Sequence, residues 1–343
     1  MKKTLPILII ALAFLSCEKE KAGPTHDTTP IEFGNVETRA VVESVETMKD
    51  GGGFGVFAYL NGGTGAESIY SSILENEKVY WVPTEGAWAY DDVKYWTSGR
   101  NYHFFAYYPY NGNESAISDV TVVQDGTGNC TGNRLTFTTP ADANVDLMTA
   151  SATVDTSKPS YSKTVPMTFN HELVQVNVIV EQDFEKNPAG DRGTEFCVNS
   201  IILSNIRKKG TLTVSGLGDG ATNTWTYDAS EAPMEFKYSE PEDKPISTLD
   251  GKVVRLSDND LILIPQATGS INLAMTYKYG TYVDGNIVWE PRSANVNLPA
   301  GTWKAGTKVT YSISLYQDKA MVFVKVTVAG WGTNQSGGTI IIK

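Results

Sequence analysis

The chain has 343 residues, of which 20% are charged, and it carries a formal net charge of −11 at pH 7. An acidic chain repels phosphate backbones, and the sequence contains no basic stripe, so these features argue against a nucleic-acid partner. The length is sufficient for two ordinary domains.

The amino terminus has the pattern of a bacterial lipoprotein signal. Lys2 and Lys3 precede an apolar run over 5–15. This run is too short to span a bilayer, which takes about 20 apolar residues, but it suits a secretory signal. We therefore expect a signal peptide over 1–16 and a lipid anchor on Cys17, which would become the first residue of the mature chain. A plain secretory signal with a chance cysteine is the alternative.

After a polar spacer over 21–30, nearly every apolar segment is short, β-branched or aromatic, and bounded by Gly, Asn, Asp or Pro. No segment sustains a 3.6-residue apolar period over three turns. The pattern predicts an all-β chain built from β-sandwiches, with few and short helices. The expected strands are 54–60, 78–82, 102–108, 135–138, 173–180, 200–206, 261–264, 271–277, 309–315 and 321–328.

The strand over 102–108 is bulky on both faces, which favours burial on both sides over an aromatic surface for stacking on sugar rings. An internal echo suggests two related halves, because Trp96 and Gly99 before this strand recur as Trp303 and Gly306 before another. A polar stretch over 155–160 could separate the halves. We expect one sandwich over 40–160 and a second over 161–343.

Motifs for catalysis, metals and cofactors are missing from the sequence. The histidines His26, His103 and His171 share no metal-ligand spacing, and there is no nucleophile elbow or phosphate-binding loop. We interpret His171 as a structural histidine that bonds to backbone at a strand entry. The pattern predicts no enzyme, no metal and no cofactor.

Two further features leave alternatives open. The loop from Asp125 to Asn129 offers oxygen ligands for Ca²⁺ but lacks the further carboxylates of a strong site, which favours a polar turn. Cys130 and Cys197 could form a disulfide or remain separate small hydrophobes, since the sequence cannot place their Cα atoms within about 7 Å of each other.

Strands with apolar alternation lie at both ends of the body. One covers 31–33, and two at the far end cover 322–328 and 339–343. A terminal strand of one subunit can replace a missing strand in its neighbour, although both ends could instead close their own sandwiches. The predicted donor residues are Val322, Val324, Val326, Val328, Ile340 and Ile342.

Several motifs, taken in order along the mature chain, resemble the fimbrillin family of Bacteroidales. No single motif is highly specific, and the resemblance lies in their order over essentially the whole mature chain. The motifs are Cys17, 38–40 (TRA), 54–59 (FGVFAY), 102–109 (YHFFAYYP), 145–150 (VDLMTA), the 169–173 strand, 263–266 (LIPQ) and Trp331.

The resemblance implies two tandem transthyretin-like β-sandwich domains and export as an outer-membrane lipoprotein. It also implies that an arginine-specific protease cuts after the first strand, and that a carboxy-terminal strand of another pilin subunit fills the groove. On this chain Arg39 would precede the cut and Ala40 would follow it. The removed segment would be 17–39, with its strand over 31–36, and the donor segment would be 322–343.

The resemblance leaves other roles open. Some members of the family stay uncleaved as pilus anchors, and others are tip adhesins. A protein of another class, a monomeric surface lipoprotein that binds a host or bacterial glycan through its aromatic side chains, is the alternative to a pilus subunit.

Overall fold

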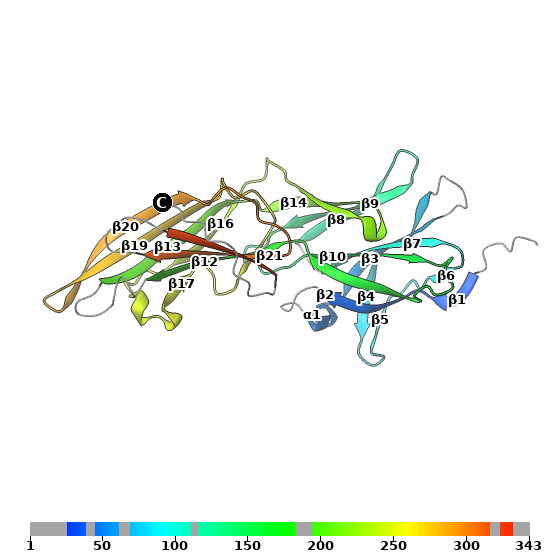
Figure 1. The fold of residues 1–343 in the computed structure, drawn as a ribbon, viewed down its shortest axis with the longest axis horizontal. Coiled ribbons are helices and arrows are strands. Elements are labelled where there is room, and N and C mark those ends of the chain that lie inside the picture. The colour runs from blue at the N-terminus through cyan, green and yellow to red at the C-terminus, as the bar shows by residue number, and fades with distance from the viewer. Residues whose placement is uncertain are drawn as a thin grey trace, which may run out of the picture.

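The computed structural model describes residues 26–38, 45–61, 69–110, 116–182, 194–315 and 323–331. Within these ranges the chain is almost entirely β-structure, which confirms the predicted all-β class (Figure 1). The same ranges contain no helix long and apolar enough to cross a membrane. The helical elements within the described ranges are α1 (Val45–Asp50) and three short 3-10 turns, η1 (Gly218–Gly220), η2 (Ile246–Thr248) and η3 (Asp250–Lys252).

The largest sheet has seven described strands and curls until its two outer strands approach each other. The curl is closed by hydrogen bonds from Ile31 N to Lys94 O (2.8 Å) and from the Tyr90 hydroxyl to Ile31 O (2.9 Å). In order across the sheet, the strands are β2 (Glu32–Thr38), β11 (Thr164–His171), β10 (Met148–Asp155), β7 (Asn101–Tyr108), β3 (Phe54–Asn61), β4 (Tyr70–Val82) and β5 (Ala87–Ala89). A separate ribbon pairs β1 (His26–Pro30) with β6 (Tyr95–Thr97).

Strand β7 shows why this sheet is buried on both faces. Tyr102 and Phe104 point into the curl, while Phe105 and Tyr107 lie on the other face against the next sheet, and all four are buried. Successive side chains of a strand alternate between faces, so bulky residues at every position need cover on both sides. The prediction of burial on both sides is confirmed.

A four-stranded sheet covers the outer face of the curled sheet, and together they form what we call the first sandwich. Its shared core includes Phe57, Leu135, Phe137 and Leu212. In order across the sheet, the strands are β15 (Thr222–Thr226), β14 (Lys209–Ser215), β9 (Cys130–Thr138) and β8 (Ile117–Gln124).

Strand pairing does not follow the expected division at residue 160. Strand β11 pairs with β10, and β14 pairs with β9, although β11 and β14 both come after that point in the chain. Sheets select neighbours by the apolar surface that each strand covers, and sequence distance does not limit this choice.

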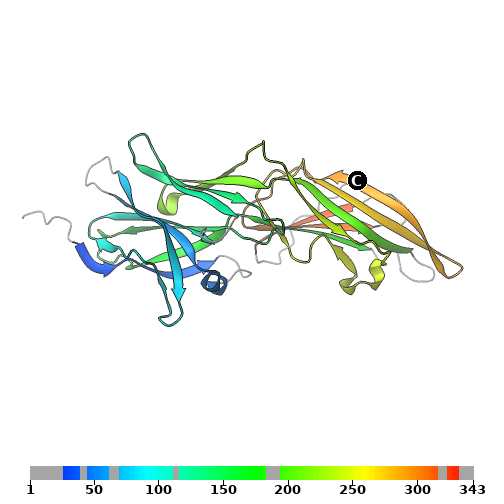
Figure 2. The ribbon, with the colours of Figure 1, turned by 180° about the vertical axis from the view of Figure 1, so that it is seen from behind.

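The second sandwich lies beyond the first along the long axis of the molecule, as Figure 1 and the reverse view in Figure 2 show. Its two sheets enclose one apolar core. One sheet contains β17 (Val253–Arg255), β18 (Leu261–Leu263), β12 (Val174–Gln182), β21 (Thr307–Leu315) and β22 (Phe323–Gly330). The other contains β16 (Met234–Ser239), β13 (Thr194–Ile206), β19 (Asn272–Val283) and β20 (Asn286–Asn297).

The echo noticed in the sequence has the same local structure in both sandwiches. Trp96 and Trp303 are fully buried, and each is followed by a glycine with positive φ, Gly99 at 72° and Gly306 at 69°. Glycine adopts this backbone conformation without the steric cost that a Cβ brings. In each case the turn feeds a strand that lies inside its sheet, β7 or β21.

Candidate functional site

Strand β2 lies at the edge of the curled sheet, and among the described strands it pairs with β11 alone, in parallel. Its apolar side chains are nonetheless buried, with Phe33 at 4% and Val36 at 7% exposure, and so is Ile31 just before the strand at 1%. Burying such a side chain contributes about 2 kcal/mol of hydrophobic stabilisation. Strand β2 is therefore a cover for the core. One ladder with β11 attaches it to the sheet, and the hydrogen bonds of Ile31, just before the strand, close the curl on its other side.

The surface beneath β2 is aromatic. The ring of Phe33 makes edge-to-face contacts with Tyr90 at 5.5 Å and with Phe54 and Phe104 at 6.1 Å between centroids. Without β2, these rings and the free edge of β11 would line an apolar groove the length of one strand. Such a groove offers backbone donors and acceptors together with side-chain pockets, which is what an added strand needs.

Most predicted site residues lie outside the described residues. Arg39 and Ala40, which follow the end of β2 directly in the sequence, are among them, and the cut between them stays a prediction. The others outside are Cys17, Val322, Ile340 and Ile342.

Strand β22 holds the remaining predicted donor residues. It pairs antiparallel with β21 and is the outermost described strand of its sheet. Val326 is buried in the core of the second sandwich, whereas Val328 is 45% exposed. Val324 lies on the same strand. In this state β22 completes its own sheet.

An apolar pocket of about 290 Å³ opens beside β22. Val326 and Val328 line it together with Trp303, Tyr311 and Pro299. Val326 and Val328, two of the predicted donor residues, thus line one apolar surface, as the alternation predicted.

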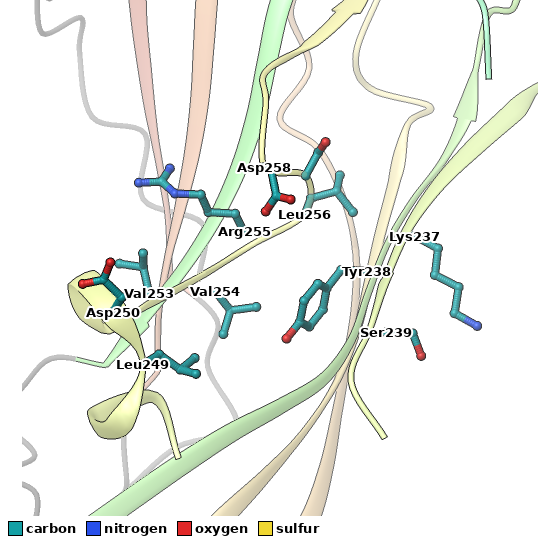
Figure 3. A pocket seen from close by; sticks show the side chains of 11 residues that line it. Lys237, Tyr238, Ser239, Leu249, Asp250, Val253, Val254, Arg255, Leu256 and Asp258 are labelled. Carbon is teal, nitrogen blue, oxygen red and sulfur yellow. The ribbon is translucent and has the colours of Figure 1, made fainter. Parts of the chain in front are cut away.

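A polar cleft of about 600 Å³ lies between β16 and the segment after η3 (Figure 3). Tyr238 points across it toward Val254, and Asp258 lies at its rim. No tryptophan lines this cleft. All seven tryptophans fall within the described ranges and none of them is exposed, so the ring of exposed tryptophans expected around a glycan-binding cleft is not found there.

His171 is structural, but the predicted backbone partner is wrong. Its Nδ1 lies 2.5 Å from Oδ2 of Asp146, and both side chains are buried. A buried carboxylate and a buried ring each need a polar partner, and each supplies the other. The ring of Trp331 stacks on the imidazole with centroids 4.2 Å apart and planes 10° apart.

This contact brings together motifs that are distant in the sequence. The 145–150 motif contributes Asp146, the 169–173 strand contributes His171, and Trp331 closes the described chain. Ile264 of the 263–266 motif packs in the same cluster. Spacing alone could not reveal the contact, because Asp146 precedes β10, His171 ends β11 and Trp331 follows β22. Their joint presence in one family pattern is the signal that points to it.

The loop after β8 is a polar turn, the interpretation that the sequence favoured over a Ca²⁺ site. The Asp125 carboxylate accepts hydrogen bonds from Thr127 N (2.9 Å), the Thr127 hydroxyl (2.7 Å) and Asn129 N (3.1 Å). These bonds lower the pKa of Asp125 to about 2. The described residues contain no group of three or more His, Cys, Asp or Glu placed to hold a metal ion.

Both described cysteines are free and buried. Cys130 packs in the core of the first sandwich, and Cys197 belongs to β13 of the second. Burial raises the pKa of the Cys197 thiol to about 11, which leaves it a poor nucleophile. Cys130 and Cys197 are therefore separate small hydrophobic residues and do not form a disulfide.

The model of the fimbrillin-like family matches residues 38–331. The fimbrium subunit Fim1C of Phocaeicola vulgatus is 24% identical over 99% of this chain and 99% of its own length. The crystal structure of a fimbrial protein from Bacteroides vulgatus, 22% identical, matches with a TM-score of 0.65 over 88% of this chain and 99% of that chain.

A putative cell adhesion protein from Bacteroides uniformis, 20% identical, matches 88% of this chain and 98% of its own with a TM-score of 0.41. The family match spans both sandwiches and includes the residues that meet around His171. By this match the chain belongs to the fimbrillin-like family.

Proposed function

We propose that the protein is a structural subunit of a cell-surface fimbria and supports adhesion. Membership of the fimbrillin-like family supports this role, and so does the likeness over nearly the whole chain to a protein named as a fimbrium subunit. The family is one of structural subunits, so the proposed role needs no catalytic residues. In this proposal the subunit is exported as a lipoprotein that is anchored to the outer membrane through Cys17.

Assembly would begin with a cut by an arginine-specific protease between Arg39 and Ala40. The cut would release the lipid anchor together with β1 and β2. The carboxy-terminal segment 322–343 of another subunit would then fill the groove over β11. The observation that carries this proposal is the state of β2, which pairs with one described strand at the edge of its sheet. Its apolar side chains, with that of Ile31 just before it, nevertheless cover the aromatic core.

The donor strand, like the groove that receives it, must present an apolar surface. A strand that leaves one sheet for another needs an apolar face that both sites can bury. Val326 and Val328 line an apolar pocket at the outermost described strand of the second sandwich, where only β21 holds β22 in the sheet. This arrangement supports the exchange, because only one ladder must break.

The test is digestion of the purified precursor with an arginine-specific protease, followed by intact mass measurement and electron microscopy. We expect an early cut after Arg39 and the subsequent appearance of ladders or fibres. The variant Arg39→Ala should stay monomeric. The matched control Arg292→Ala removes an exposed arginine on β20 and should assemble as the parent does.

Two results would contradict the proposal. Fibres formed equally by Arg39→Ala would show that the cut at this bond is irrelevant to assembly. A cleaved chain that loses β2 and remains monomeric at high concentration would show that strand exchange does not follow the cut.

A further inference from the structure

Three polar side chains meet between the two sheets of the first sandwich. Thr149 comes from β10 in the curled sheet, and Asn223 comes from β15, the outer strand of the four-stranded sheet. Glu172 follows β11 and is buried at 5% exposure. Its Oε1 accepts hydrogen bonds from the Thr149 hydroxyl at 2.5 Å and from Asn223 Nδ2 at 2.6 Å.

The Thr149 hydroxyl and the Asn223 side-chain amide are also in contact with each other. Asn223 Nδ2 lies 3.2 Å from Thr149 Oγ1. The amide carbon is one bond of about 1.3 Å from that nitrogen, so it lies within about 4.5 Å of the hydroxyl oxygen. A nucleophile, an acyl group and a carboxylate in contact with both are the parts that acyl transfer requires. We propose that Thr149 and Asn223 become joined by an ester bond that forms without another enzyme and links the two sheets.

The atoms balance without any co-reactant. Glu172 takes the proton of the Thr149 hydroxyl, and Oγ1 forms a bond to Cγ of Asn223. The bond from Cγ to Nδ2 then breaks, and Glu172 delivers the same proton to the departing nitrogen, which leaves as ammonia. Nothing is oxidised or reduced, and Glu172 returns to its starting form.

The surroundings of Glu172 favour its role as the group that accepts and then delivers the proton. Burial raises the pKa of its carboxyl, with the hydrogen bonds from Thr149 and Asn223 opposing that effect. A carboxylate with a raised pKa is a stronger base than one in water, which suits removal of a hydroxyl proton. Trp225 donates its ring N–H to the backbone oxygen of Glu172 at 3.2 Å and so fixes this turn of the chain. Asn223 lies on an exposed strand, which gives ammonia a way out.

The test is peptide mapping by mass spectrometry on the full chain. We expect the peptides that contain Thr149 and Asn223 to appear as one linked species, lighter than their sum by the mass of one ammonia molecule. Hydroxylamine, which cleaves esters and spares amides, should separate them. Thr149→Val and Glu172→Gln should each abolish the linked species.

The matched control is Thr153→Val on the same strand, whose hydroxyl contacts Asp219 N and the His103 ring and should not affect the link. Mapping of the parent chain decides the matter even if a variant fails to fold. Recovery of the two parent peptides unlinked and with unchanged masses would overturn the proposal. Conversion of Asn223 to aspartate without a link would overturn it as well.

Discussion

At the scale of single residues, Phe33 of β2 packs directly against the aromatic core. It is 4% exposed and touches the rings of Phe54, Tyr90 and Phe104. We expect Phe33→Ala to lower the free energy of unfolding by about 3–5 kcal/mol, because it removes the ring and leaves a cavity. Urea unfolding would measure this, with the exposed neighbour Glu32→Ala as the control. An equal loss in both variants would contradict it.

Asp125 gives a prediction about pH. The hydrogen bonds to its carboxylate hold the folded pKa at about 2, below the ordinary value of about 3.9. The stabilisation is therefore present above the unfolded pKa and is lost as the pH falls through about 2. We expect Asp125→Asn to be less stable than the parent at pH 5 and to converge with it towards pH 2. Urea unfolding at a series of pH values tests this, and a constant difference would refute it.

At the scale of elements, the exchange of strands can be tested in trans. A chain that begins at Ala40 should bind a synthetic peptide covering 322–343, because the groove over β11 would be empty. The same peptide carrying Val326→Asp should bind at least tenfold more weakly, since it would bury a charge in an apolar groove. Fluorescence polarisation of labelled peptides measures both affinities. Equal affinities would mean that the peptide does not use this face.

The sequence predicted the positions of most strands, but it did not predict which strands pair with each other in the sheets. Alternation and turn residues predicted the strands now seen as β3, β7, β12 and β21. Their parallel or antiparallel pairing was beyond such reasoning, since β12 pairs in parallel with β21 across more than a hundred residues. Backbone hydrogen-bonding groups are the same in every strand, so local pattern does not select a partner.

At the scale of the whole molecule, the two sandwiches share a junction. Leu173 precedes β12, Ile264 follows β18 and Trp331 follows β22, so all three flank strands of the second sandwich. They nevertheless pack in the core of the first. We expect Trp331→Ala to reduce stability by about 3–5 kcal/mol and to separate the melting of the two sandwiches in calorimetry. Trp289→Ala on the outer strand β20 is the control, and it should keep a single transition. One unchanged transition in both variants would show that the junction does not couple the sandwiches.

The all-β class, the burial of the aromatic strand and the paired tryptophan turns followed from the sequence. These properties depend on the alternation of side chains and on backbone conformations within a few residues. Tertiary structure decided three others: that β2 covers the core from the edge of a curled sheet, that His171 meets Asp146 and Trp331, and that Thr149 reaches Asn223. Each of these depends on which distant surfaces exclude water together, and a linear pattern does not contain that information.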